Sequence, residues 1–326
     1  MRALLGLILL LFAGLCSAIT PPTPMVTLPA GYVYEFGDEF STANWTTTEV
    51  TPYHTPITSQ RWYAMQPNSQ FMSEGYAAQP PGSLGYPFAT NYPNNPHFLS
   101  MGWWKDSSGG LAGCFIASVD QTYHGTMGSS LPYPGAVRHG YFEGKFQFPV
   151  PQPGLKGSTS GLWPAFWFQP IGTNAQGLAP ELDGFDLYSI DGFTTAHTTW
   201  HIWGPNGYAA GKTYSYDPTG AGCEGSYWTP AAGVPPFCDG KWHTWGLLVT
   251  ATDLVTYLDG KLVWDAPNPD DTVYDLPMFI DIDCAFGGGW SISLGWNVPS
   301  YPGTTGPGMY SMKINYVRVW ANPAEQ

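Results

Sequence analysis

Apolar and polar side chains alternate along much of this chain in short runs that end at Gly, Pro, Asn or Asp, and helical periodicity is almost absent. This pattern predicts β-strands in the runs Gly140–Phe148, Leu162–Phe168, Trp242–Thr250, Met278–Phe286 and Met312–Trp320. Two further runs, Leu254–Leu258 and Lys261–Trp264, flank Asp259-Gly260, a dipeptide typical of hairpin turns. Many strands without helices indicate an all-β fold, a sandwich of two antiparallel sheets.

The domain organisation follows from the same pattern. No second break in composition and no internal repeat occurs, so residues 31–322 are expected to form one domain, with residues 323–326 as a tail. Residues 1–18 contain Arg2, an apolar run too short to span a membrane, and small residues up to Ala18, which is typical of a cleaved signal peptide. Residues 19–30 begin with a Pro- and Thr-rich stretch and are expected to be a spacer. A secreted protein, extracellular or periplasmic and without a membrane anchor after cleavage, is expected.

The cysteines and the charge narrow the function classes. Without the signal peptide, Cys114, Cys223, Cys238 and Cys284 remain, an even number in an oxidising compartment. Cys223 and Cys238 flank a short loop-like stretch and are the favoured disulfide, whereas the other two fit buried thiols equally well. The formal net charge is -13, which disfavours nucleic acid, anionic membranes and highly sulfated or carboxylated glycans. A neutral polysaccharide is the expected partner.

The stretch Pro180–Tyr188 carries the candidate chemistry. Glu181 and Asp183 point to one face of a regular strand, and Asp186 would point to the other. A β-bulge at Gly184 would bring Asp186 to the same face. Three neighbouring carboxyls cannot all ionise freely, and glycoside hydrolysis needs one ionised and one protonated carboxyl. An acidic turn or a calcium site would fit the same spacing.

The flanking motifs carry a family resemblance. The segments Trp163–Trp167 and Thr199–His201 surround the carboxylate strand, and further matches, in family order, are Asp38–Phe40, Gly140–Lys145, Gly287–Trp290 and Asn315–Trp320. Together they resemble glycoside hydrolase family 16, the laminarinase, lichenase, agarase and carrageenase group. The resemblance implies a concanavalin-like β-jelly-roll sandwich and retaining hydrolysis of β-glycans.

By this resemblance, Glu181 takes the nucleophile position, Asp183 the supporting carboxylate position and Asp186 the acid/base position, where the family has Glu. Asp is one methylene shorter than Glu, so its carboxyl lies about 1.5 Å further back. His201 resembles a family His that tunes Asp183 or binds a sugar hydroxyl.

Several aromatic residues are candidates for sugar binding. Trp163, Trp167, Trp203 and Trp290 could stack on sugar rings, and core packing is the alternative for each. For Trp163 and Trp167, one core position and one cleft position are expected. Glu143 matches a family residue with a structural role. No cofactor or catalytic metal is expected. The resemblance leaves a structural calcium ion far from the cleft open, although Asn315, where calcium-binding relatives have Asp, lacks a charged oxygen ligand.

The predicted function is therefore a secreted glycosidase that cleaves β-glycosidic bonds of a neutral polysaccharide, internal ones favoured, by a retaining double displacement. A β-1,3- or mixed β-1,3/1,4-glucan is the favoured substrate. A transglycosylase and a non-catalytic glycan-binding protein on the same scaffold are the alternatives, and a polysaccharide lyase ranks last because the chain has only 11 Lys and Arg.

Overall fold

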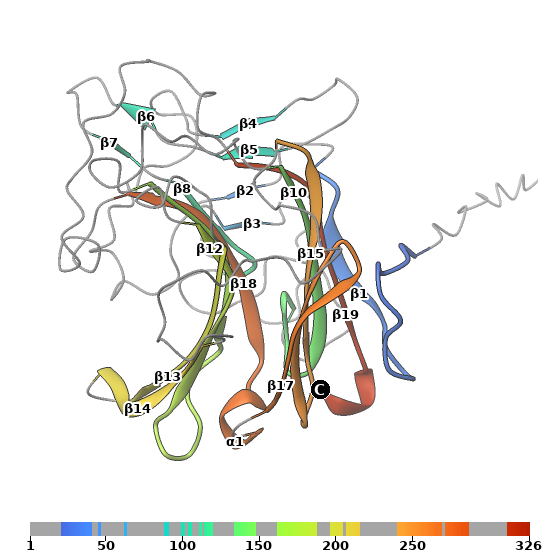
Figure 1. Ribbon diagram of the computed structural model, residues 1–326, viewed down its shortest axis with the longest axis vertical. Coiled ribbons are helices and arrows are strands. Elements are labelled where there is room, and N and C mark those ends of the chain that lie inside the picture. Colours follow the sequence, from blue (N-terminus) through green and yellow to red (C-terminus); the bar gives the residue numbers. More distant parts are fainter. Residues whose placement is uncertain are drawn as a thin grey trace, which may run out of the picture.

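Two β-sheets, packed face to face, account for nearly all regular structure in the described residues (Figure 1). The computed structural model describes residues 21–40, 45–46, 62–63, 88–90, 99–101, 104–105, 111–112, 114–119, 134–147, 162–187, 196–204, 207–215, 240–268, 271–286 and 312–326. The predicted signal peptide, the Cys223–Cys238 pair and Trp290 lie outside these residues. Within this part of the chain no helix is both long and apolar enough to cross a membrane.

The first sheet has the order β17-β16-β15-β10-β19-β5-β4, and β1 also pairs with β19. Its strands are β1 (Val33–Asp38), β4 (Phe88–Thr90), β5 (Leu99–Met101), β10 (Gly140–Gln147), β15 (Trp242–Val249), β16 (Asp253–Leu258), β17 (Lys261–Pro267) and β19 (Met312–Ala321).

The second sheet has the order β14-β13-β12-β11-β18-β8-β3-β2, and β9 also pairs with β18. Its strands are β2 (Trp45–Thr46), β3 (Trp62–Tyr63), β8 (Cys114–Ala117), β9 (Ala136–Val137), β11 (Leu162–Pro170), β12 (Ala179–Leu187), β13 (Ala196–Gly204), β14 (Gly207–Ser215) and β18 (Met278–Phe286). The strands of this sheet pair antiparallel except β2 and β3, which are parallel. The remaining elements are the hairpin β6 (Trp104–Lys105) and β7 (Leu111–Ala112), the one-turn helix α1 (Asp271–Tyr274) and a 3-10 turn at Pro323–Glu325.

The predicted strands are confirmed. Each long run matches an observed strand within two residues at either end, and Met278–Phe286 matches without any shift. The hairpin between β16 and β17 is also confirmed, because Asp259 and Gly260 have φ angles of 49° and 72°. Positive φ at both turn residues matches the right-handed twist of the two strands. Asp259 also lies 2.7 Å from Nδ1 of His243, which gives that histidine a structural contact.

Aromatic side chains between the sheets build the core. Phe142 and Phe146 of β10 meet Phe168 and Phe166 of β11, with ring centroids 4.5 Å and 5.1 Å apart. Phe146 also packs edge-on against Phe185 of β12 at 5.0 Å. Large aromatic rings bury much apolar area and add favourable edge-to-face contacts. The core therefore holds β11 and β12, the strands of the candidate site, against the first sheet.

The outer face of the first sheet is covered by the segment expected to be a spacer. Val26 and Leu28 pack on the cluster that contains Tyr141 and Trp320. The backbone N–H of Met25 donates a hydrogen bond of 2.7 Å to Glu143. The hydroxyls of Tyr141 and Tyr316 donate to the same carboxylate, at 3.0 Å each. These contacts fit the structural role predicted for Glu143.

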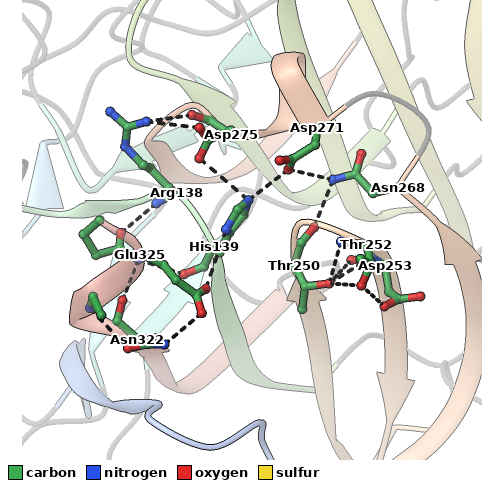
Figure 2. A network of polar contacts seen from close by, with 12 residues as sticks. Arg138, His139, Thr250, Thr252, Asp253, Asn268, Asp271, Asp275, Asn322 and Glu325 are labelled. Atoms are coloured by element: carbon green, nitrogen blue, oxygen red, sulfur yellow. Dashed lines mark hydrogen bonds and ion pairs between the residues drawn. The ribbon is translucent and has the colours of Figure 1, made fainter.

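A polar network ties the chain's C-terminal end to the sandwich (Figure 2). His139, just before β10, lies 3.1 Å from Asp271 of α1, 3.8 Å from Asp275 and 3.6 Å from Glu325. The side chain of Gln326 donates to the carbonyl of His139 at 3.1 Å. The expected tail of residues 323–326 is therefore docked on the sandwich.

The predicted bulge is present in β12. On β11, Phe166 pairs with Phe185 and Trp167 with Asp183, so Gly184 has no partner residue in the register. On β13, Thr199 pairs with Asp183 and His197 with Asp186. Leu182 and Phe185 are both core residues although three positions separate them. The bulge therefore turns Asp183 and Asp186 to the same outer face.

Gly184 is required by space rather than by φ. A Cβ atom at this position would lie 2.8 Å from the carbonyl oxygen of Phe166, closer than such contacts allow. We expect Gly184→Ala to lower the free energy of unfolding by about 1–3 kcal/mol, measured by urea denaturation. Gly172→Ala is the control, because its Cβ would meet nothing within 4 Å and only its φ of 85° is unfavourable, at a cost of about 1 kcal/mol. A Gly184→Ala variant as stable as wild type would contradict this account of the bulge.

Candidate active site

Three carboxyls of β12 share the outer face of the second sheet. Strand alternation places Leu182, Phe185 and Leu187 in the core and turns Glu181, Asp183 and Asp186 away from it. Asp183 and Asp186 are nevertheless only 4% and 6% exposed. Burial of several carboxyls side by side disfavours full ionisation, which is the electrostatic basis of the site.

Glu181 is held by a tryptophan from the neighbouring strand. The indole N–H of Trp203 in β13 donates a hydrogen bond of 2.8 Å to Oε2 of Glu181. Burial, followed by the charge of Asp183, raises the pKa of Glu181 to about 8, while His201 and the Trp203 hydrogen bond act in the opposite direction. Without a bound substrate, the carboxyls of the site are therefore not all ionised at neutral pH.

Asp183 pairs with a histidine. Nε2 of His201 in β13 lies 3.1 Å from Oδ2 of Asp183 and 4.0 Å from Oε1 of Glu181. Burial and the charge of Asp283 raise the pKa of Asp183 well above its ordinary value. Burial lowers the pKa of His201, with Glu181 opposing. Burial thus disfavours the charged form of both members of this pair.

Asp186 is held in the same way as Glu181. The indole N–H of Trp163 in β11 donates a hydrogen bond of 2.8 Å to Oδ1 of Asp186. In the register, Asp186 lies between Ala165 of β11 and His197 of β13. This hydrogen bond fixes Oδ1 of the short Asp186 side chain.

Trp163 and Trp167 lie on the same face of β11, where Trp167 is buried and Trp163 is partly exposed. Both belong to a cluster with Phe115, Ala117 and Ala165, separate from the inter-sheet core. The reason is strand periodicity, since residues four apart on a regular strand share a face. Trp167 donates its indole N–H to Asp283 at 2.6 Å.

Two carboxyls of the site were missed by the sequence analysis. Asp281 and Asp283 of β18 lie on the outer face, opposite the core residues Ile280 and Ile282, and are 0% and 1% exposed. They pair in the register with Trp167 and Ala165 of β11. The signal was two Asp residues at alternate positions of an otherwise apolar strand, which is an unusual use of charge in a buried strand.

Three residues of the cluster have the spacing of metal ligands. Ligand atoms of Glu181, Asp183 and His201 lie within 4.8 Å of one another. Metal binding at this cluster would require both carboxyls and the imidazole to be deprotonated. We assign no metal ligand here.

Raised carboxyl pKa values predict how stability changes with pH. Glu181, Asp183 and Asp281 bind protons more tightly in the folded state than in the unfolded state. Their contribution to stability is therefore complete below about pH 4 and is lost as pH rises toward about 8, the pKa of Glu181. We expect Asp281→Asn to make the fall in Tm between pH 4 and pH 8 less steep than in wild type.

The control for this experiment is Asp265→Asn, which alters an exposed carboxylate of β17 on the other sheet. It should reproduce the wild-type slope in the same thermal unfolding series. An Asp281→Asn slope equal to that of wild type would show that Asp281 has no raised pKa.

Comparisons with known proteins show a similarity of fold to solved structures. No family model matches the sequence, and no curated protein matches it. One similar solved structure is a glycoside hydrolase family 16 protein of a Bacteroides ovatus mixed-linkage glucan PUL, solved with a product. Its TM-score is 0.54 at 14% sequence identity, and the match covers 87% of this chain and 99% of that chain. A family 16 endo-glucanase from the same organism has a TM-score of 0.53 at 14% identity, with the same coverage.

A third solved structure extends the comparison. SCLam, a non-specific endo-β-1,3(4)-glucanase of family 16, has a TM-score of 0.52 at 16% identity, and the match covers 93% of this chain and 96% of SCLam. Matches of this extent span both sheets, although the identities are low. The chain therefore has the β-jelly-roll sandwich fold of glycoside hydrolase family 16.

Proposed function

We propose that this protein is a secreted retaining glycoside hydrolase that cleaves a neutral β-glucan, with Glu181 as nucleophile, Asp186 as acid/base and Asp183 as supporting carboxylate. The observation that carries the proposal is the Gly184 bulge, which turns the three carboxyls of β12 to one face. A retaining enzyme needs two carboxyls on that face with different protonation states.

The proposed first step forms a glycosyl-enzyme. A carboxylate oxygen of Glu181 attacks the anomeric carbon, and Asp186 gives its proton to the departing glycosidic oxygen. The Trp203 N–H and His201 both favour the ionised form of Glu181. Burial and the charge of Asp183 oppose them, and a proton on Asp183 removes that second negative charge next to the nucleophile.

The proposed second step releases the sugar. Asp186, now ionised, takes a proton from water, and the water oxygen attacks the anomeric carbon as the bond to Glu181 breaks. An acceptor sugar in place of water would give transglycosylation. The Trp163 hydrogen bond supports the ionised Asp186 in this step, because an N–H donor stabilises a carboxylate.

The substrate class is supported by two arguments. The net charge of -13 disfavours anionic polysaccharides. Solved structures of the same fold include a non-specific endo-β-1,3(4)-glucanase and a protein of a mixed-linkage glucan PUL. We therefore place β-1,3- and mixed β-1,3/1,4-glucans first. Trp163 and Trp203, both partly exposed, offer indole surfaces on the carboxyl face, whereas Trp167 is buried; Trp290 stays a further prediction.

A non-catalytic glycan-binding protein is the second candidate. The observation that favours it is Asp186, whose carboxyl is one methylene shorter than that of Glu. A displacement of about 1 Å in a catalytic group can lower the rate on the order of 100-fold. Retention of Glu181 and Asp183 in fixed geometry favours catalysis over this alternative.

The first test is release of reducing sugar from laminarin, barley β-glucan, agarose, carrageenan and xyloglucan. We expect wild type to cleave laminarin or barley β-glucan and Glu181→Gln to lose on the order of 10³-fold or more of the turnover. Asp265→Asn, an exposed change on the other sheet, should keep wild-type activity. Binding without turnover in wild type, with turnover gained in Asp186→Glu, would establish the glycan-binding alternative.

A second test separates the two catalytic roles. Asp186→Ala is expected to lose about 10²–10⁴-fold on polysaccharide and far less on a dinitrophenyl glycoside, whose leaving group needs no proton. Azide should then give a product of retained configuration. Glu181→Ala is expected to fail on both substrates and, with azide, to give the inverted glycosyl azide. The opposite pattern would exchange the two roles.

A further inference from the structure

Gln169 places a buried amide on the carboxyl face of the second sheet. On β11, Phe166 and Phe168 point into the core, so Gln169 points to the opposite, outer face, which it shares with Trp167. Gln169 is 6% exposed, the same fraction as Asp186. The amide is therefore no deeper in the fold than the proposed acid/base.

The neighbours of Gln169 on the outer face are apolar or aromatic. On its own strand and just beyond it they are Trp163, Ala165, Trp167 and Ile171, which belong to the clusters over β11 and β18. On β18 its register partner is Phe279, which has no hydrogen-bonding group in its side chain. A Leu or Met would pack equally well among such neighbours, so packing does not explain the amide.

The amide of Gln169 has a donor without an acceptor. Its Nε2 is buried, and within the described part of the chain it has no hydrogen-bond partner. A buried amide in this state opposes folding, because it loses its hydrogen bonds to water and gains none in return. The fold therefore retains an N–H donor that a bound oxygen atom can satisfy.

The register places Gln169 next to Glu181. Phe168 of β11 pairs with Leu182 of β12, so the next position along the antiparallel pair brings Gln169 opposite Glu181. Directly opposite residues project from the same face, with Cβ atoms about 4.5–5.5 Å apart. The carboxamide and the proposed nucleophile therefore project side by side.

The two oxygens of Glu181 have different contacts. Oε2 accepts the hydrogen bond from Trp203, whereas Nε2 of His201 lies 4.0 Å from Oε1, too far for a hydrogen bond. Among the described residues Oε1 therefore has no donor, and its lone pairs are available for attack. The anomeric carbon must come to about 3–3.5 Å from the attacking oxygen. The carbon bonded to it, C2, then carries its hydroxyl into reach of the side chains beside Glu181.

We propose that Gln169 is a specificity-determining residue: its carboxamide N–H donates a hydrogen bond to the 2-hydroxyl of the sugar that Glu181 attacks. The proposal rests on the proposed function of Glu181 as nucleophile. The terminal torsion of a glutamine is broad, so the buried amide can turn toward an arriving hydroxyl. Hydrogen bonds to the 2-hydroxyl strengthen in the transition state of glycoside hydrolysis, so the contact acts mainly on kcat.

The test compares dinitrophenyl β-laminaribioside with its analogue that lacks the 2-hydroxyl on the ring bearing the dinitrophenyl group. Gln169→Met keeps the length of the side chain and removes the N–H. We expect this variant to lower kcat/KM for the parent glycoside about 10-fold, mostly in kcat, and to leave kcat/KM for the 2-deoxy analogue within about twofold of wild type.

Thr256→Val is the matched control. The hydroxyl of Thr256, in β16 of the other sheet, is also buried and has no partner among the described residues. An apolar group in place of an unpaired buried polar group is neutral or stabilising, so both variants should have a Tm equal to or above that of wild type. Only Gln169→Met should change the ratio of kcat/KM between the two glycosides.

Equal effects of Gln169→Met on the two glycosides, including no effect on either, would overturn the proposal. A Tm well below that of wild type would also overturn it, because the amide would then have a partner within the folded protein. If wild type cleaves neither glycoside, the proposed function fails, and calorimetric titration with laminaritriose tests the contact instead. Its affinity should fall about 10-fold in Gln169→Met and not in Thr256→Val, and equal affinities would reject the contact.

Discussion

Strand β12 must bury Leu182 and Phe185 against the first sheet, yet these residues are three positions apart, which a regular strand does not allow on one face. The bulge at Gly184 resolves this conflict by adding one residue between them. Without it, and with Leu182 in the core, Phe185 would leave the aromatic core and Asp186 would enter it. The site therefore depends on a packing constraint, and the carboxyl cluster is its consequence on the opposite face.

One type of hydrogen bond recurs on the outer face of the second sheet. Three indole N–H groups each hold one carboxyl: Trp203 holds Glu181, Trp163 holds Asp186 and Trp167 holds Asp283. An indole has a donor and no acceptor, so it fixes the position of a carboxylate and favours its charge without competing for protons. The same rings offer apolar faces, which suits a site that binds sugars. Aromatic content thus serves both the core and the ionisation of the site.

Much of this arrangement could be predicted from the sequence. Alternation located the long strands. The bulge was predicted at Gly184 because one extra residue there brings Asp186 to the face of Glu181 and Asp183. Short strands such as β2, β3 and β9 have two residues each, too few for any alternation to appear. Asp283 was missed because its role arises from Trp167, which is distant in sequence and adjacent only through the β11–β18 register.

The buried carboxyls oppose folding, and the fold tolerates them because they hold protons. Asp183 and Asp281, if ionised, would each lack sufficient compensation in a nearly dry environment, so the folded protein keeps them neutral. Asp283, the other carboxyl of β18, accepts a hydrogen bond from the indole N–H of Trp167. A glycosidase site must supply both a carboxylate and a protonated acid. The simplest way to build it is to place several carboxyls together, so that fixed N–H donors stabilise the charged form of particular ones. By that logic the distribution of indole N–H groups, rather than the number of acids, determines the chemistry available on this face.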